Sequence, residues 1–267
     1  MATNLRILWN NLLQGSGVTV TPDNENTNFP ATNTLLDQRQ LVYRSSAIAA
    51  AYNVKYDFGA AKAITAACFF DANALQSDSY ILEASANNFS TVAFSTTPTA
   101  SNLTPSAATV HVKNRFVLFI FAAQTYRYWR IRPGGATPAI DAFQSFSKAF
   151  LGTYLEPTKN YAYGMQLGVV DLSETWMTPN GADNTARRPA FWEVAFDMPL
   201  MSRTSDAADL RALVDSVGTF QPVVCILDQD LESSRQTLYG KFTRNPGFAP
   251  RRGALVDVMG YGFRESI

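Results

Sequence analysis

The amino-acid sequence predicts a mainly β protein, with an N-terminal β-sandwich followed by a smaller α+β domain that has one main helix. Three observations predict this fold class. Short apolar or alternating runs, separated by turn residues, continue from Leu5 to about Phe150, which is typical of an all-β sandwich. A Pro-Gly-Gly-Ala-Thr-Pro break ends at Pro138. Beyond it, apolar residues recur at helical spacing from Leu210 to Val217.

The strands of the sandwich follow one another through the first half of the chain. Each is a run of strand length that is apolar or alternates, and the segment Thr21–Asn28 between the first two is dense in turn-forming residues. We expect strands at Leu5–Leu13, Tyr52–Phe58, Ile64–Phe70, Tyr80–Ser85, Arg115–Ala122, Tyr126–Arg132 and Ile140–Leu151.

The strand Tyr126–Arg132 interleaves basic and aromatic residues, a pattern that can mark nucleic-acid binding. Alternation would place Trp129 and Ile131 on one face, and Tyr126 with Arg130 on the other. One face of a sandwich strand must enter the core, and this accounts for the aromatic residues without a ligand. We therefore expect no nucleic-acid partner.

The second part of the chain has a different character, and polar turn residues between Gly152 and Lys159 separate it from the first. The predicted domains are 1–151 and 152–267. Ser205 can cap a helix whose first turn carries Asp206, and Gly218 can end it. Residues 177–189 are predicted to be a polar loop. Strands are expected at Tyr161–Asp171, Ala190–Met198, Pro222–Leu227, Gln236–Phe242 and Ala254–Phe263.

The composition favours a protein that works inside an assembly. Its 22 basic and 22 acidic residues cancel, so no overall field draws it to nucleic acid or an anionic membrane. Charged residues make up only 16% of the chain, and interfaces can replace the missing charged surface. Cys68 and Cys225 lie in apolar runs and are expected to be free, buried thiols. No apolar stretch reaches the length of a membrane span and no secretory signal precedes the sandwich, so we expect cytoplasmic synthesis and no membrane partner.

Catalytic and cofactor motifs are not found in the sequence. The single histidine, His111, lies in a strand-like run and is a weak candidate for a base or a metal ligand. Asp228 and Asp230 could act as a pair of glycosidase carboxylates, although they also suit a turn. Asp71 and Asn73 could bind calcium, but their spacing does not match an EF-hand loop. We expect no enzyme activity, no cofactor and no metal.

The stretch Phe29–Phe58 and the strands after it resemble the discoidin family of galactose-binding-like sandwiches. Tyr43-Arg44-Ser45 stands where the family usually has Trp-x-Ser, and Tyr80–Ser85 resembles its strand that ends in Ser. The resemblance implies a jelly-roll β-sandwich that binds ligands with loops at one end. It thereby implies a ligand site on the loop from Gln38 to Tyr52, formed by Tyr43, Arg44 and Tyr52. Tyr43 and Arg44 could instead brace the end of the sandwich.

The second half resembles modules of bacteriophage and prophage tail proteins, through Leu151–Pro157, Tyr161–Gly164 and the strand-helix-strand segment that reaches Leu227. In those proteins a sandwich precedes a small α+β domain that builds rings at the tail tip. The resemblance implies a distal-tail-like component of a tail tip or baseplate, made in the host cytoplasm and located in the virion. Its partners would be further copies of itself and other tail proteins. A carbohydrate-binding module for attachment to host-surface glycan is the alternative function, and a glycan hydrolase is a third.

Overall fold

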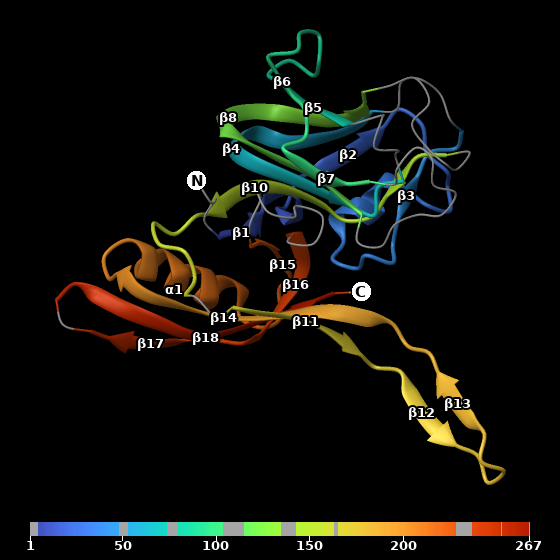
Figure 1. Cartoon of the computed structure of the whole chain (residues 1–267). Coiled ribbons are helices and arrows are strands. Elements are labelled where there is room, and N and C mark those ends of the chain that lie inside the picture. Colours follow the sequence, from blue (N-terminus) through green and yellow to red (C-terminus); the bar gives the residue numbers. More distant parts are fainter. Residues whose placement is uncertain are drawn as a thin grey trace. The chain divides into compact units, whose positions relative to one another are not determined.

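A computed structural model describes residues 5–47, 53–73, 80–103, 115–134, 143–162, 165–227, 237–251 and 253–266. Within these ranges the chain forms eighteen strands, two short 3-10 helices and one α-helix, so the predicted mainly β fold class is confirmed (Figure 1). The chain divides into two compact units. The sandwich unit is Leu8–Tyr154; the C-terminal unit contains Leu155–Leu227 and Thr237–Ile267. The predicted boundary between residues 151 and 152 falls inside a strand, Ala149–Leu155.

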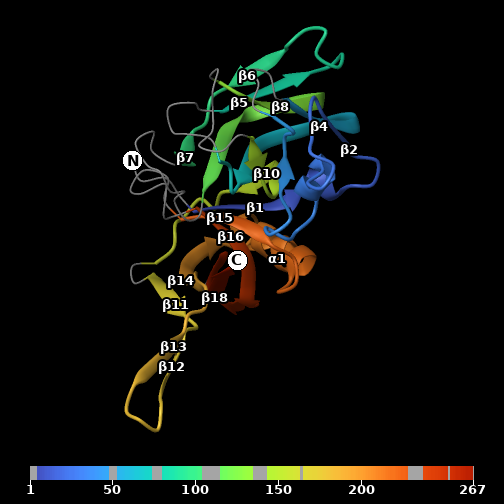
Figure 2. The same cartoon turned by 90° about the vertical axis from the view of Figure 1, so that its right-hand side faces the viewer.

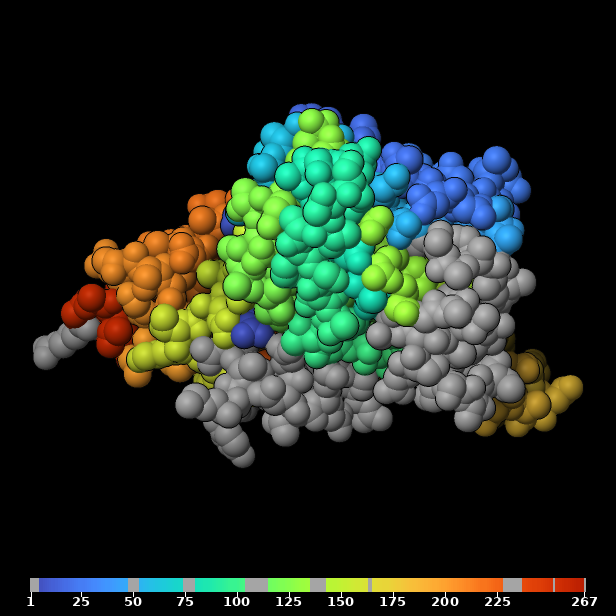
Figure 3. All heavy atoms as spheres, turned by 90° about the horizontal axis from the view of Figure 1, so that it is seen from above, coloured from blue at the N-terminus to red at the C-terminus, as the bar shows by residue number. Residues whose placement is uncertain are grey.

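Two long strands, β4 and β8, form the middle of the sandwich and take part in both of its layers. They pair antiparallel along their length, and register shifts interrupt the pairing after Asp57 and after Ile64. In one layer β2 flanks β4 and β5 flanks β8, while β6 pairs with β5; in Figure 3 the teal surface that contains β5 and β6 lies against the green surface of β8. In the other layer β10 flanks β4 and β7 flanks β8. The bounds are β1 Arg6–Asn11, β2 Thr19–Pro22, β4 Val54–Phe70, β5 Tyr80–Ser85, β6 Phe94–Thr96, β7 Ala100–Asn102, β8 Phe116–Pro133 and β10 Ala149–Leu155; the 3-10 helices are η1 Leu12–Gln14 and η2 Ala31–Leu35.

The sandwich core lies between these layers and is rich in aromatic rings. Trp129 of β8 is fully buried, and its ring contacts those of Phe94, Phe121 and Tyr126. The prediction that Tyr126 faces away from Trp129 is therefore wrong. The register shift between Asp57 and Lys62 breaks the alternation of β8 at this point, because four β4 residues lie opposite Arg127 alone.

The C-terminal unit is a five-stranded antiparallel sheet in the order β11-β14-β18-β16-β15, with β17 paired to β18. Helix α1 (Asp206–Val217) is confirmed: Leu210, Leu213 and Val217 are fully buried, and Gly218 ends the helix at a φ of +53°. Ser205 contributes its backbone oxygen rather than its side chain to the first turn. The bounds are β11 Gln166–Asp171, β14 Ala190–Ser202, β15 Val223–Ile226, β16 Thr237–Arg244, β17 Gly247–Pro250 and β18 Leu255–Glu265.

The prediction that residues 177–189 form a polar loop is wrong in part, because much of this segment belongs to a two-stranded ribbon. β12 (Glu174–Met177) pairs with β13 (Asp183–Ala186), and both strands are exposed along almost their whole length. The turn between them suits the sequence, since Gly181 adopts a φ of +78° and Thr178 bonds to Ala182 through its backbone and its hydroxyl. Figures 1 and 2 both show this ribbon extending from the sheet of its own unit.

Both cysteines are buried and free, as predicted. Among the described residues, no helix has the length and hydrophobicity needed to cross a membrane.

Candidate functional site

The predicted ligand residues Tyr43 and Arg44 form the short strand β3 (Tyr43–Arg44), which pairs with β9 (Ser145–Phe146). The Tyr43 side chain is 1% exposed, and its ring centroid lies 5.3 Å from that of Phe146. Its hydroxyl donates a hydrogen bond to the backbone oxygen of Asn24 at 2.6 Å. In this structure Tyr43 therefore braces the end of the sandwich.

Arg44 points away from the core and is held between two aromatic rings. Its guanidinium carbon lies 4.0 Å from the ring centroid of Phe29 and 4.7 Å from that of Phe143, and all three side chains are half-buried. Such stacking fixes the plane of the guanidinium. In the part of the chain that the structure describes, Arg44 makes no ion pair, and its Nε is buried without a hydrogen-bond partner. Arg44 is thus a cation that is held in place by stacking and that no described carboxylate binds.

Other arginines of the sandwich differ from Arg44 because carboxylates bind them. Arg39 donates to both oxygens of Asp71, at 3.1 and 2.7 Å, and Arg127 does the same to Asp57, at 2.7 and 2.8 Å. The Arg127 guanidinium holds the pKa of the Asp57 carboxyl below its ordinary value. Arg130 and Arg132 share the buried carboxylate of Glu83.

The end of the sandwich that carries Arg44 also contains an ion pair between a buried lysine and an exposed carboxylate. Lys148 is 1% exposed; its ammonium donates to the backbone oxygen of Leu35 at 3.0 Å and lies 3.0 Å from Asp37. Burial lowers the pKa of Lys148, and the nearby Asp37 carboxylate opposes this shift. The hydrogen bond from Lys148 to Leu35 ties the last residue of helix η2 to the residue before β10.

Tyr52, the third predicted ligand residue, lies outside the described residues, as do His111, Asp228 and Asp230. Ligand binding by Tyr43, Arg44 and Tyr52 stays a prediction. Among the described residues, no group of three or more His, Cys, Asp or Glu side chains could hold a metal ion.

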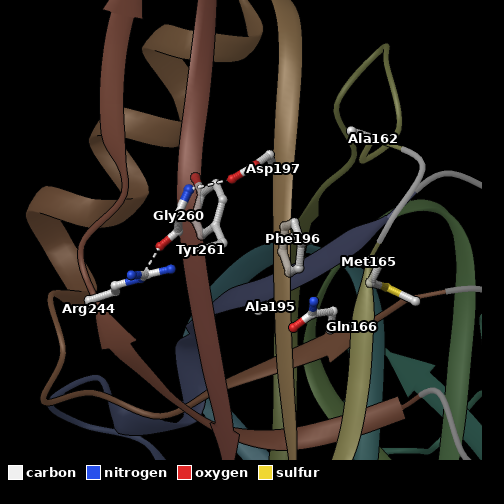
Figure 4. Close-up of a pocket in the computed structure, with 9 residues that line it drawn as sticks. All are labelled: Ala162, Met165, Gln166, Ala195, Phe196, Asp197, Arg244, Gly260 and Tyr261. Atoms are coloured by element: carbon white, nitrogen blue, oxygen red, sulfur yellow. Dashed lines mark hydrogen bonds between the residues drawn. The ribbon is translucent and has the colours of Figure 1, made fainter.

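A second candidate surface lies on the C-terminal sheet, where three adjoining hollows have volumes of about 230, 380 and 510 Å³. Arg244 lines the first two, and Thr243 joins the second to the third. In the first hollow, drawn in Figure 4, Arg244 Nε donates to the Gly260 oxygen at 2.7 Å, and the Gly260 N–H donates to Asp197 at 2.6 Å. The Asp197 carboxylate therefore already accepts a hydrogen bond from a backbone N–H.

No protein-family model and no curated protein matches the sequence. Solved structures of carbohydrate-binding modules are similar in fold at low identity. Chitosan-binding module 1 from a Paenibacillus sp. IK-5 chitosanase/glucanase is 17% identical, with a TM-score of 0.38 over 53% of this chain and 96% of the module. The family 32 module of Clostridium perfringens NanJ, solved with galactose, is 12% identical, with a TM-score of 0.39 over 57% and 99%. The C. perfringens module CpGH89CBM32-5, solved with GalNAc-β-1,3-galactose, is 11% identical, with a TM-score of 0.39 over 54% and 100%.

Sequence reasoning identified Arg44 but could not show that it lacks a carboxylate, because ion pairing depends on residues far away in the chain. It missed the hollows, which result from the pairing of β11, β14, β18 and β16. The sequence does contain a local signal for the ribbon. Trp176 and Met177 precede an Asn-Gly pair, which is typical of a hairpin turn, in an otherwise polar segment.

Proposed function

We propose that this chain is a non-enzymatic attachment protein whose sandwich binds carbohydrate at the end that carries Arg44. The observation that supports the proposal is the guanidinium of Arg44, which is stacked between Phe29 and Phe143 and unpaired with any described carboxylate. Half-buried rings offer apolar surface to the C–H groups of a sugar, and the guanidinium donates to its oxygens. Because an Arg fork matches a carboxylate bidentately, acidic saccharides should bind more tightly than neutral ones.

Binding of the full-length chain to arrays of neutral and acidic saccharides tests this function, and calorimetry then measures the affinity of any hit. Arg44→Gln removes the charge and the fork, and it should weaken binding at least tenfold. Arg44→Lys keeps the charge but not the fork, so its affinity for the saccharide should lie between those of the wild type and Arg44→Gln. Arg188→Gln, in the C-terminal unit, is the control. A chain that binds no saccharide, or an Arg44→Gln variant that binds as tightly as the wild type, contradicts the proposal.

A second candidate function is that of a structural component of a phage tail tip or baseplate, assembled as a ring and located in the virion. The β12–β13 ribbon favours it, because Trp176 is 51% exposed and Met177 is 70% exposed. A two-stranded ribbon is at best marginally stable alone in water, so one that exposes large apolar side chains is suited to a partner. Sedimentation and electron microscopy of the purified chain test this function, and a chain that remains monomeric at high concentration contradicts it.

A further inference from the structure

The three hollows of the C-terminal unit form one furrow, defined by the residues that line them, across the sheet strands β11, β14, β18 and β16. The pairing explains the furrow. Small residues lie near one another on three strands: Ala195 of β14 pairs with Gly262 of β18, and Gly168 of β11 pairs with Glu193, two residues from Ala195 along β14. A Cβ added at Gly168 would meet nothing within 4 Å, so the furrow is open there.

Three basic side chains, Arg244, Lys241 and Arg264, and three acidic ones, Asp197, Glu193 and Glu265, line the furrow, so its formal charges balance. Arg264 pairs with Glu193 across the furrow at 3.1 Å. Arg244 and Lys241 also line it, and neither forms an ion pair with a described residue. Of the other acidic side chains, Asp197 is exposed and already accepts the Gly260 N–H, and Glu265 is buried and accepts the Trp192 N–H.

The ribbon has one face with the complementary chemistry. Residues that alternate along a strand share a face, and Met177 pairs directly with Asp183, so these two side chains lie together with Thr175 and Thr185. Asp183 is exposed and forms no ion pair with any described residue. Trp176 and Asn184 lie on the opposite face. The face with Met177 and Asp183 thus combines one large apolar side chain with one unpaired carboxylate.

The dimensions of the two surfaces also agree. Each strand of the ribbon has four residues and so extends about 13 Å at roughly 3.3 Å per residue. The furrow crosses four strands, a width of about 14 Å at roughly 4.8 Å between neighbours. An elongated element fits such a furrow better than a compact small molecule does.

We infer that the ribbon of one copy docks into the furrow of a second copy, with Met177 over the small-residue floor and Asp183 paired to Arg244. The hydrogen bonds and ion pairs of β12 and β13 stay within the ribbon segment, and Figures 1 and 2 show the ribbon extending from its own sheet. Ribbon and furrow are different surfaces, so the contact is heterologous and propagates into a ring or filament. The inference rests on the self-association of the second candidate function and is independent of carbohydrate binding.

Charge exchange between full-length variants tests the contact by sedimentation velocity. Asp183→Lys and Arg244→Glu should each weaken self-association at least tenfold when present alone. A mixture of the two variants should restore the large species, because each kind of ribbon then finds a furrow of opposite charge. Asn184→Lys adds a similar charge to the opposite face of the ribbon and should leave association unchanged.

A steric variant separates the contact from any loss of folding. Gly168→Trp fills the furrow at an open position and should abolish association, whereas Gly168→Ala should leave it intact; circular dichroism checks that each variant is folded. A monomeric wild type overturns both the inference and the ring. Wild-type rings that persist in Gly168→Trp and Asp183→Lys overturn the inference alone, and so does a variant mixture that fails to reassemble.

Discussion

Replacing Glu83 with Gln should strongly destabilise the sandwich, because two arginines depend on this carboxylate. The Glu83 side chain is 5% exposed; it lies 2.6 Å from Arg130 Nη2 and 2.9 Å from Arg132 Nη2, and it also accepts from both Nε atoms. Removing one partner of a fully buried ion pair costs about 3–5 kcal/mol. Arg130 and Arg132 are 19% and 34% exposed, so water replaces part of the loss. We therefore expect the free energy of unfolding to fall by about 2–3 kcal/mol.

Urea unfolding of the full-length chain, followed by circular dichroism and tryptophan fluorescence, measures this change. Arg132→Gln is the matched control: it removes the more exposed partner and leaves Glu83 bound to Arg130, so it should cost only about 1 kcal/mol. If Glu83→Gln lowers the free energy of unfolding by less than about 0.5 kcal/mol, the typical limit for a neutral surface change, then the ion pairs add no net stability and the reasoning is refuted.

Three further changes test other parts of the structure. Gly240→Ala should lower the free energy of unfolding of the C-terminal unit by about 3 kcal/mol, because the new Cβ would lie 1.9 Å from the Arg264 backbone oxygen; calorimetry measures it. Asp257→Asn should remove part of the acid sensitivity of the fold. The Leu200 N–H, and then Arg251, hold the pKa of Asp257 below its ordinary value. The stability that the ionised carboxylate contributes is therefore present above about pH 4 and is lost as the pH falls through the folded-state pKa. Tyr43→Phe should cost about 1 kcal/mol in urea unfolding and leave saccharide binding unchanged, because its hydroxyl donates to the Asn24 backbone oxygen within the sandwich end.

Each of these predictions has a contradicting outcome. Gly168→Ala is the control for Gly240→Ala, and equal effects of the two would show that the close approach at Gly240 is relieved by a shift of the backbone. Parallel curves of stability against pH for Asp257→Asn and the wild type would show that Asp257 is not stabilised as a carboxylate. Loss of saccharide binding in a stable Tyr43→Phe variant would show that Tyr43 contacts the ligand.

The sequence was sufficient for the elements whose signals are local. The helix from Asp206 to Val217 depends on its own apolar spacing and on Gly218. Five strands of the C-terminal sheet were predicted with ends within five residues of those observed, whereas β17 was not predicted. The continuity of the long strands was not predictable in this way. Asp57 to Lys62 contains a Gly at a φ of +71°, which suggests the end of a strand, yet β4 continues through it as a bulge.

The candidate surfaces depend on long-range pairing and were therefore harder to predict. Arg44 and Phe143 are far apart in sequence and meet only because β3 pairs with β9. The furrow needs Gly262 opposite Ala195 and Gly168 opposite Glu193 on adjacent strands, and no local pattern encodes that pairing. The face of Tyr126 was wrong for the same reason, since the register shift that turns it arises in the partner strand.

The charge balance of the chain connects the two candidate surfaces. Basic and acidic residues are equal in number at 22 each, and among the described residues some cations and some carboxylates are left without an ion pair. In the C-terminal unit Arg244 and Asp183 form no ion pair with a described residue, and the proposed contact with a second copy would pair them. Arg44 differs, because stacking by Phe29 and Phe143 holds it in place without a counter-charge. A cation fixed in this way gains most from an external acceptor, and this is why Arg44→Gln should affect saccharide binding while self-association stays unchanged.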